Sequence, residues 1–209
     1  MTGYSDRINH ALAFAAKHLD QQVRHGTRLP YLTTPANIAV ILTRYAQHDE
    51  VVVAGILRDV VEDCVRDGYA AQMLTQRIGE KFGDDVLRTA LAACPRRLDD
   101  DGVELTGEER RDDFLERLTG SNATVQWVVA ADLVHSGGSL LSDLSRTDFP
   151  ETIWTRFAAG KEGTIRWYGR VHDQLASLGF DAPIMVELRD IVTQLERWNP
   201  AEEEMDAPL

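Results

Sequence analysis

The chain has 209 residues, of which 44% are hydrophobic and 27% charged, as is ordinary for a soluble globular protein with one core. Its formal net charge of −12 argues against the basic surface that nucleic-acid binding through phosphate contacts requires. It contains no run of about 18 apolar residues and no secretory signal pattern, so we expect a cytoplasmic protein that binds neither nucleic acid nor a membrane.

The first part of the chain has the periodicity of helices. Between residues 8 and 23 the apolar residues recur at steps of three and four, as on one face of an amphipathic helix. Thr34 and Pro35 fit the N-cap and the first position of the next helix. The run at 50–63 is apolar nearly all round and longer than a typical strand, so we interpret it as a central, buried helix.

Further helices follow, separated by glycines and loops. Asn122 fits the N-cap of a strongly apolar helix around Asp132, and Gly179 fits the C-cap of a long helical segment that begins near residue 150. The other expected helices lie near 70–82, 84–93, 107–119 and 183–198. The sequence therefore predicts an all-α bundle of about eight or nine helices. We expect one domain at 1–199 and a solvated acidic tail at 200–209.

Three stretches carry the most informative pattern, namely "RHGTRLPYLTTPANIAVIL" at 24–42, "AGILRDVVEDC" at 54–64 and "VVAADLVHS" at 128–136. In this order and spacing they resemble motifs of the HD-domain phosphohydrolases of the small alarmone hydrolase type, relatives of the hydrolase half of RelA/SpoT proteins. The stretch "RFAAGKEGTIRWYGRV" at 156–171 also resembles a segment common in bacterial members. The resemblance implies an HD-domain helical bundle and a relationship to guanosine polyphosphate pyrophosphohydrolases.

The family's metal ligands are altered in this chain. Members hold one divalent metal, usually manganese, through two histidines and two aspartates, and the matching positions here are Thr34, Arg58, Asp59 and Asp132. Threonine is a poor ligand, and a guanidinium is permanently cationic and has no lone pair to donate. We therefore expect a lost metal site and no metal cofactor. Arg58 would replace the metal as the cation beside Asp59 and Asp132.

Other pocket positions are partly retained. Glu62 and Asp63 match the acidic pair that orients and activates the attacking water in the family, whereas Leu133 and Ser136 replace a lysine and an asparagine. The candidate catalytic set is thus Arg58, Asp59, Glu62, Asp63 and Asp132. The candidate ligand-binding set, which favours a small anionic or nucleotide-like partner, is Arg24, His25, Tyr31, Thr34, Lys161 and Tyr168.

These residues also have explanations without chemistry. Arg58 and Glu62 are one helical turn apart and could form an ordinary pair on an exposed edge, worth about 0.2–0.5 kcal/mol. Thr34 could be a helix cap and nothing more. Lys161 and Tyr168 could be ordinary helix surface and core. If the resemblance holds, however, Thr34, Arg58, Asp59 and Asp132 should converge in one cavity, with Glu62 and Asp63 at its rim.

Three functions stay open at this point. The first, which we favour, is a degenerate HD-domain protein that binds a small anionic or nucleotide-like ligand and does not hydrolyse it. The second is an enzyme repurposed to metal-independent acid–base chemistry in the old pocket. The third is an active alarmone 3′-pyrophosphohydrolase with unusual ligands, which ranks last because metal activation of water is the step that the lost ligands served. A homo-oligomeric assembly is left open.

Overall fold

The computed structural model describes residues 4–24, 27–66 and 69–198, with the side chains of 63–71 excepted, so the predicted acidic tail lies outside it. These residues form ten helices and two isolated β-bridges, and no strand is found among them. The helices are α1 (Asp6–His18), α2 (Thr33–Arg44), α3 (Asp49–Arg66), α4 (Tyr69–Phe82), α5 (Asp84–Ala92), α6 (Gly107–Thr119), α7 (Ala123–Ser145), α8 (Glu151–Trp154), α9 (Gly160–Ser177) and α10 (Ile184–Glu196). The expected all-α fold is confirmed.

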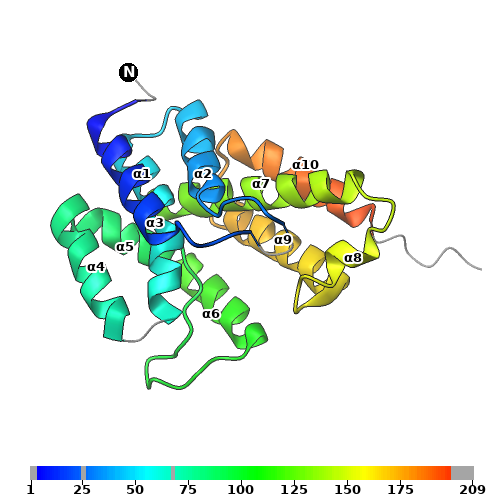
Figure 1. The fold of residues 1–209 in the computed structure, drawn as a ribbon. Coiled ribbons are helices and arrows are strands. Elements are labelled where there is room, and N and C mark those ends of the chain that lie inside the picture. The colour runs from blue at the N-terminus through cyan, green and yellow to red at the C-terminus, as the bar shows by residue number, and fades with distance from the viewer. Residues whose placement is uncertain (1–3, 25–26, 67–68, 199–209) are drawn as a thin grey trace, which may run out of the picture.

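Helix α3 lies at the centre of the fold and packs against α1, α2, α4, α5 and α7 (Figure 1). Every residue from Val51 to Val61 is buried, including Arg58 and Asp59. The side chains of this run are apolar nearly all round the helix, so burial of every face stabilises the folded state. The expected central buried helix is confirmed, and Arg58 and Asp59, the two charged residues of this run, are enclosed with it.

Helix α7 is the second organising element and packs against α2, α3, α5, α9 and α10. The side chain of Asn122 accepts a hydrogen bond from the backbone N–H of Val125, which confirms the expected N-cap. Asp132 lies near the middle of the helix, which continues beyond Ser136 as far as Ser145. Despite this length, neither α7 nor any other helix in the described part of the chain is apolar enough to cross a membrane.

The start of α2 differs from the expectation. The helix begins at Thr33 with Leu32 as its N-cap, so Thr34 is not the cap but lies in the first turn, with its side chain buried. The backbone N–H groups of Thr33 and Thr34 donate to the carbonyls of Pro30 and Tyr31. This turn extends the helical backbone upstream of Pro35 and leaves the Thr34 side chain free to face the interior.

The expected long helix from residue 150 is two helices, which is why the bundle has ten helices rather than nine. Helix α8 ends at Trp154 and α9 begins at Gly160, whose φ of +67° is a left-handed conformation that favours glycine. At the other end, Gly179 has a φ of +75°, its N–H donates to Ala176 O, and the next N–H donates to Leu175 O. This is the Schellman arrangement, so the predicted glycine cap is confirmed.

Two adjacent glycines in α7 give a matched test of this packing. A Cβ on Gly137 would lie 2.5 Å from Ile191 Cγ2 of α10 and 3.0 Å from Tyr168 Cε1 of α9, whereas a Cβ on Gly138 meets nothing within 4 Å. We expect Gly137→Ala to lower the free energy of unfolding by about 1–3 kcal/mol through overpacking. Gly138→Ala should leave it unchanged or raise it by up to about 1 kcal/mol. Urea denaturation measures both, and equal effects would contradict the close packing.

Candidate functional site

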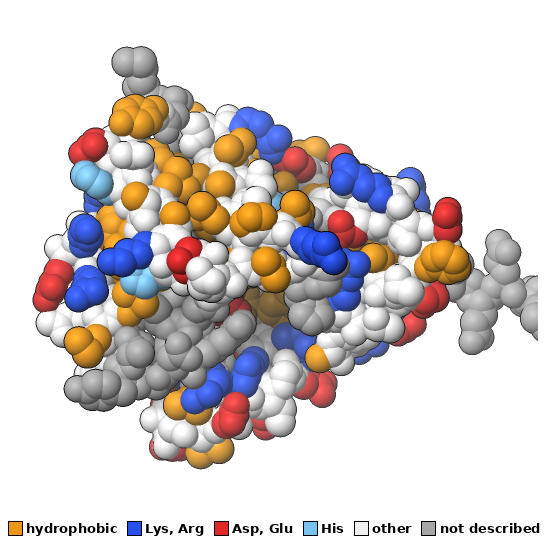
Figure 2. Space-filling view, viewed as in Figure 1, with side chains coloured by type: hydrophobic (Ala, Val, Ile, Leu, Met, Phe, Trp, Pro, Cys, Tyr) orange, Lys and Arg blue, Asp and Glu red, His pale blue; other side chains and the backbone are white. Residues whose placement is uncertain are grey.

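A cavity of about 230 Å³ lies where α3, α7 and α9 meet the segment before α2 and the link between α8 and α9. It is lined by Arg24, Tyr31, Thr34, Arg58, Asp59, Asp132, His135, Ser136, Leu140, Asp143, Ile153, Arg156, Phe157 and Tyr168. The structure thus brings the four positions that match the family's metal ligands to one cavity. The face shown in Figure 2 is hollowed near its middle, and Lys and Arg side chains gather beside the hollow.

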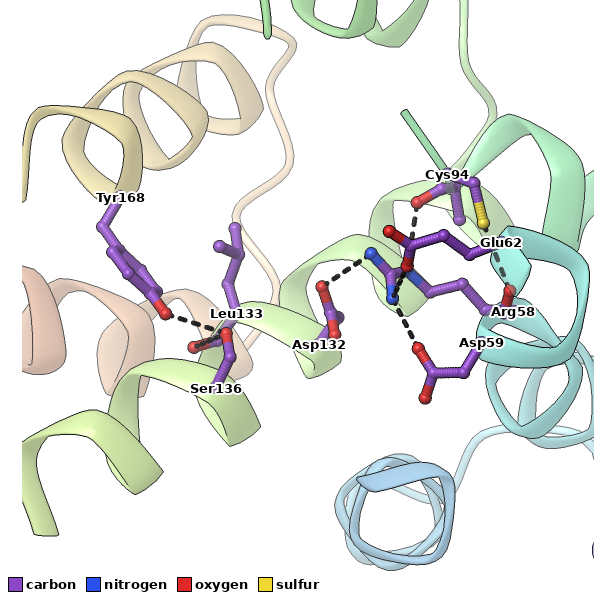
Figure 3. Close-up of polar contacts among 9 residues, drawn as sticks. Arg58, Asp59, Glu62, Cys94, Asp132, Leu133, Ser136 and Tyr168 are labelled. Carbon is purple, nitrogen blue, oxygen red and sulfur yellow. Dashed lines mark hydrogen bonds and ion pairs between the residues drawn. The ribbon is translucent and has the colours of Figure 1, made fainter. Parts of the chain in front are cut away.

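The guanidinium of Arg58 lies among three carboxylates from two helices (Figure 3). Its Nη1 is 2.7 Å from Asp59 Oδ1 and 3.4 Å from Glu62 Oε2, and its Nη2 is 3.1 Å from Asp132 Oδ2. The Arg58 side chain is only 10% exposed. The long side chain therefore folds back along α3 far enough to bridge its neighbour Asp59 and Asp132 of α7.

The segment after α5 fixes the orientation of Arg58 from the other side. Arg58 Nε donates to the backbone carbonyl of Ala93 at 3.2 Å, and the thiol of Cys94 contacts the backbone carbonyl of Arg58 at 3.3 Å. Burial lowers the pKa of Arg58, but the carboxylates of Asp132 and Glu62 outweigh it, so the net shift is upward. Arg58 is therefore a fixed, permanently charged group, whose Nε and Nη1 donate hydrogen bonds and whose Nη2 forms an ion pair with Asp132.

Asp59 is the most enclosed of the three acids. Its side chain is 1% exposed, and its Oδ2 has no hydrogen-bond partner among the residues that the structure describes. Burial raises the pKa of Asp59 to about 7, although Arg58 acts in the opposite direction. Burial also raises the pKa of Asp132. The inner end of the cavity thus holds an enclosed carboxyl group whose pKa burial raises to about 7.

The opposite end of the cavity is basic. Arg24 donates to Ser139 Oγ of α7 and forms no ion pair within the described residues, whereas Arg156 pairs with Asp143 at 3.2 Å. Burial lowers the pKa of His135 to about 4, with a further contribution from Arg24, so the imidazole is neutral at pH 7. This end therefore presents one unpaired guanidinium, one paired guanidinium and a neutral imidazole.

Two tyrosines complete the walls. The hydroxyl of Tyr168 donates to Ser136 Oγ at 2.9 Å, across the contact between α9 and α7 (Figure 3). Burial raises the pKa of both Tyr168 and Tyr31, so both phenols stay neutral donors over the physiological range. Ser136, which stands where the family has an asparagine, is thereby tied to Tyr168.

The remaining predicted residues divide into three groups. Lys161 lies in the first turn of α9 and is not among the residues that line the cavity. Glu62 contacts Arg58 from the side and is not part of the lining either. His25 and the side chain of Asp63 lie outside the described residues. The Arg58–Glu62 pair exists, but the alternative that places it on an exposed edge is wrong, because Arg58 is buried.

Sequence reasoning missed Arg156, Asp143 and Ser139 as residues of the basic end. Arg156 opens the fourth recognised stretch, and it lies in the link between α8 and α9 rather than inside a helix. The signal that could have found it is Gly160, since a glycine inside an expected helix marks a place where the helix can end.

Residues 11–100 match the family model of the HD domain. This segment of the chain is similar to an HD domain. The matched segment runs from α1 to the loop after α5 and includes Thr34, Arg58 and Asp59 of the cavity. No match was found among curated proteins.

Solved structures share the fold. The crystal structure of lmo0812 from Listeria monocytogenes EGD-e is 24% identical over 78% of this chain and 99% of its own, with a TM-score of 0.63. A metazoan ortholog of SpoT, described as hydrolysing ppGpp and acting in starvation responses, is 23% identical over 93% of this chain and 98% of its own, with a TM-score of 0.69. The expected resemblance to RelA/SpoT-type HD domains is confirmed at the level of the fold.

The side chains at the family's metal position do not suit a metal ion. Thr34 and Arg58 stand in place of two imidazoles, and the Arg58 guanidinium lies within hydrogen-bond distance of Asp59 and Asp132, the two acids that remain. A cation at this place repels a second cation and offers it no lone pair. Within the described part of the HD domain, no three His, Cys, Asp or Glu side chains are grouped so that they could hold a metal.

Removal of the Arg58 charge should strongly destabilise the protein. Arg58→Ala removes the guanidinium that pairs with the enclosed acids Asp59 and Asp132, so we expect the free energy of unfolding to fall by about 3–5 kcal/mol at pH 7. Arg88→Ala is the control, because Arg88 pairs with Asp85 on the exposed surface of α5. Arg88→Ala should change the free energy of unfolding by no more than about 1 kcal/mol. If chemical denaturation gives the two variants similar stabilities, Arg58 is not the cation that neutralises the cluster.

His135 should make stability depend on pH. The pKa of His135 is about 4 in the folded chain and about 6.5 in an unfolded one, so the unfolded state binds more protons between these values. Its contribution to the free energy of unfolding therefore falls as the pH decreases from about 6.5 towards 4. We expect His135→Gln to lack this pH dependence. Its free energy of unfolding relative to that of the wild type should therefore rise as the pH is lowered. Denaturation curves at a series of pH values test this, and parallel profiles would contradict it.

Proposed function

We propose that this chain binds a small anionic or nucleotide-like molecule without metal-dependent hydrolysis. The observation that carries the proposal is the Arg58 guanidinium, which lies between Asp59 and Asp132 where relatives of this type hold their metal. A metal activates water by lowering its pKa and polarises a phosphoryl oxygen. A guanidinium can donate hydrogen bonds to oxygen but cannot coordinate and deprotonate a water molecule in this way.

An anionic ligand is supported by the basic end of the cavity. Arg24 has a neutral partner, Ser139, and so can pair with an incoming anion at full charge. Arg156 lies beside it, and Tyr168 and Tyr31 offer hydroxyl groups from the walls. On a chain with a net charge of −12, such a place attracts an anion only through local, enclosed cations.

A second candidate function is metal-independent acid–base catalysis in the same cavity. The observation that favours it is Asp59, a buried acid that lines the cavity and whose Oδ2 has no hydrogen-bond partner among the described residues. Burial raises the pKa of Asp59 to about 7, which suits proton transfer at neutral pH. Arg58 would then hold Asp59 in place and supply positive charge to a reacting oxyanion. In the first candidate function the bound ligand is released unchanged, whereas in the second it is converted to a product.

The metal content of the purified protein tests the proposal. The wild type should carry far less than one equivalent of manganese, iron or zinc and should show no manganese-dependent hydrolysis of guanosine tetraphosphate. Thr34→His with Arg58→His should gain close to one equivalent, because the double change restores two imidazoles beside Asp59 and Asp132 and removes the opposing charge. Elemental analysis is the readout.

The two single variants are the controls. Thr34→His leaves the Arg58 guanidinium in place, and Arg58→His supplies one imidazole of two, so each should gain much less metal than the double variant. Hydrolysis need not return with the metal, because Leu133 and Ser136 still depart from the family pattern. A stoichiometric metal in the wild type would overturn the proposal and favour an active hydrolase with an unusual ligand set.

A further inference from the structure

Two guanidinium groups are held one helical turn apart at the outer end of the cavity. Arg24 donates to Ser139 of α7, and Arg156 pairs at 3.2 Å with Asp143, four residues further along the same helix. Four residues correspond to about 6 Å along the helix axis. Both arginines line the cavity, and one phosphate group has enough oxygens to accept hydrogen bonds from both.

The charge of this arginine pair is only partly compensated. Among the described residues, Asp143 is the one acid within ion-pair distance of either guanidinium, and the partner of Arg24 is a neutral hydroxyl. Two like charges so close together repel each other, and a single carboxylate leaves the pair with a net positive charge. A dianionic group between the two arginines would remove this repulsion and neutralise the remaining charge.

Hydrogen bonds order the backbone around both arginines. The backbone N–H of Arg24 donates to Leu29 O at 2.9 Å, across the turn that precedes α2. The backbone N–H of Arg156 donates to Ile153 O at 3.1 Å, in the link that follows α8. The two side chains therefore start from fixed positions, which lowers the entropic cost of ordering them around a ligand.

The wall beside the arginine pair is apolar. Leu140, Ile153 and Phe157 line the cavity together with Arg156. Leu140 and Ile153 are only 3% and 4% exposed, whereas Phe157 is partly buried and packs against the core from the surface. Phe157 is thus the most accessible apolar side chain of this wall. A ligand that covers its ring with a hydrocarbon or aromatic group removes apolar surface from water.

A second phosphate group would find no comparable cation. Within the described part of the lining, Arg58 is the one other Lys or Arg. Its guanidinium lies 2.7 Å from Asp59 Oδ1 and 3.1 Å from Asp132 Oδ2, and these acids already offset its charge. The cavity therefore suits a ligand with one phosphate group rather than a chain of them.

We propose that the outer end of the cavity binds a compact phosphate monoester, with its phosphate between Arg24 and Arg156 and a short hydrocarbon or aromatic group against Phe157. The inference rests on the proposed binding function and names its ligand class. The cavity volume of about 230 Å³ is below the roughly 300–1,000 Å³ of pockets for drug-sized ligands. A compact monoester fits this space better than a nucleoside polyphosphate.

Calorimetry at low ionic strength tests the ligand class with three probes. These are inorganic phosphate, phenyl phosphate and guanosine tetraphosphate. We expect phenyl phosphate to bind about tenfold more tightly than inorganic phosphate, because its ring covers apolar surface at Phe157. It should also bind more tightly than guanosine tetraphosphate, whose additional phosphate groups meet no free cation in the cavity.

Asp143→Asn tests the arginine pair. Loss of this carboxylate leaves Arg156 without its competing acid, so inorganic phosphate and phenyl phosphate should both bind severalfold more tightly. Asp112→Asn is the matched control, since Asp112 pairs with Arg170 at 2.7 Å outside the cavity lining and the net charge changes equally. The control should leave both affinities unchanged. Unchanged or weaker binding in Asp143→Asn would contradict a shared anion site.

Two further variants assign the parts of the ligand. Phe157→Ala should reduce the preference for phenyl phosphate over inorganic phosphate severalfold. It should leave inorganic phosphate bound as before, which also shows that the variant is folded. Arg24→Gln should weaken both compounds alike and preserve the ratio between them. A Phe157→Ala variant that binds inorganic phosphate normally and keeps the full preference for phenyl phosphate would contradict the apolar contact.

The outcomes separate this inference from the proposed function. Equal affinities for phenyl phosphate and inorganic phosphate would overturn the monoester and leave a chain that binds small anions. Tighter binding of guanosine tetraphosphate than of phenyl phosphate would overturn it as well, and would again leave the proposed function standing. Absence of binding for every probe, the tetraphosphate included, would overturn both.

Discussion

The buried guanidinium of Arg58 is the interaction on which the arrangement of the cavity depends. It joins Asp59 and Glu62 of its own helix, Asp132 of α7 and the carbonyl of Ala93 after α5. Three acids cannot stay ionised in an enclosed space without a cation, and a cation cannot be enclosed without acceptors. The Arg58 cluster therefore sets both the electrostatics of the site and the approach of α3 to α7.

The shape of the outer end of the cavity depends on the backbone conformation between α8 and α9 rather than on ion pairs. The left-handed Gly160 ends the helical path between α8 and α9, and the link that results places Arg156 and Phe157 in the cavity wall. A continuous helix would have distributed these side chains around its own surface. Both ends of the cavity thus combine residues from the two halves of the chain, Arg58 with Asp132 at the inner end and Arg24 with Arg156 at the outer end.

The helical fold and the inner end of the cavity could be predicted from the sequence. The apolar run around Gly55 is too long for a typical strand, so a buried helix was the better prediction. Motif spacing predicted that Arg58, Asp59 and Asp132 lie together, and the packing of α3 on α7 brings them to one cavity. Local turns were less predictable. Thr34 looked like a cap because Pro35 follows it, but the turn at Pro30 starts the helix earlier. Lys161 matched a motif by position, whereas its place outside the lining depends on how α9 begins.

The Arg58 cluster also has a consequence for how the chain reaches its native state. Arg58 and Asp59 are neighbours along α3, but Asp132 joins them only when α7 docks, after more than a third of the chain has intervened. Closure of so long a loop has an entropic cost that contacts within α3 do not have. While α7 is undocked the carboxylates and the guanidinium are open to water, so their desolvation accompanies the docking step. Docking of α7 is thus the event that encloses the charges and completes the cavity at the same time.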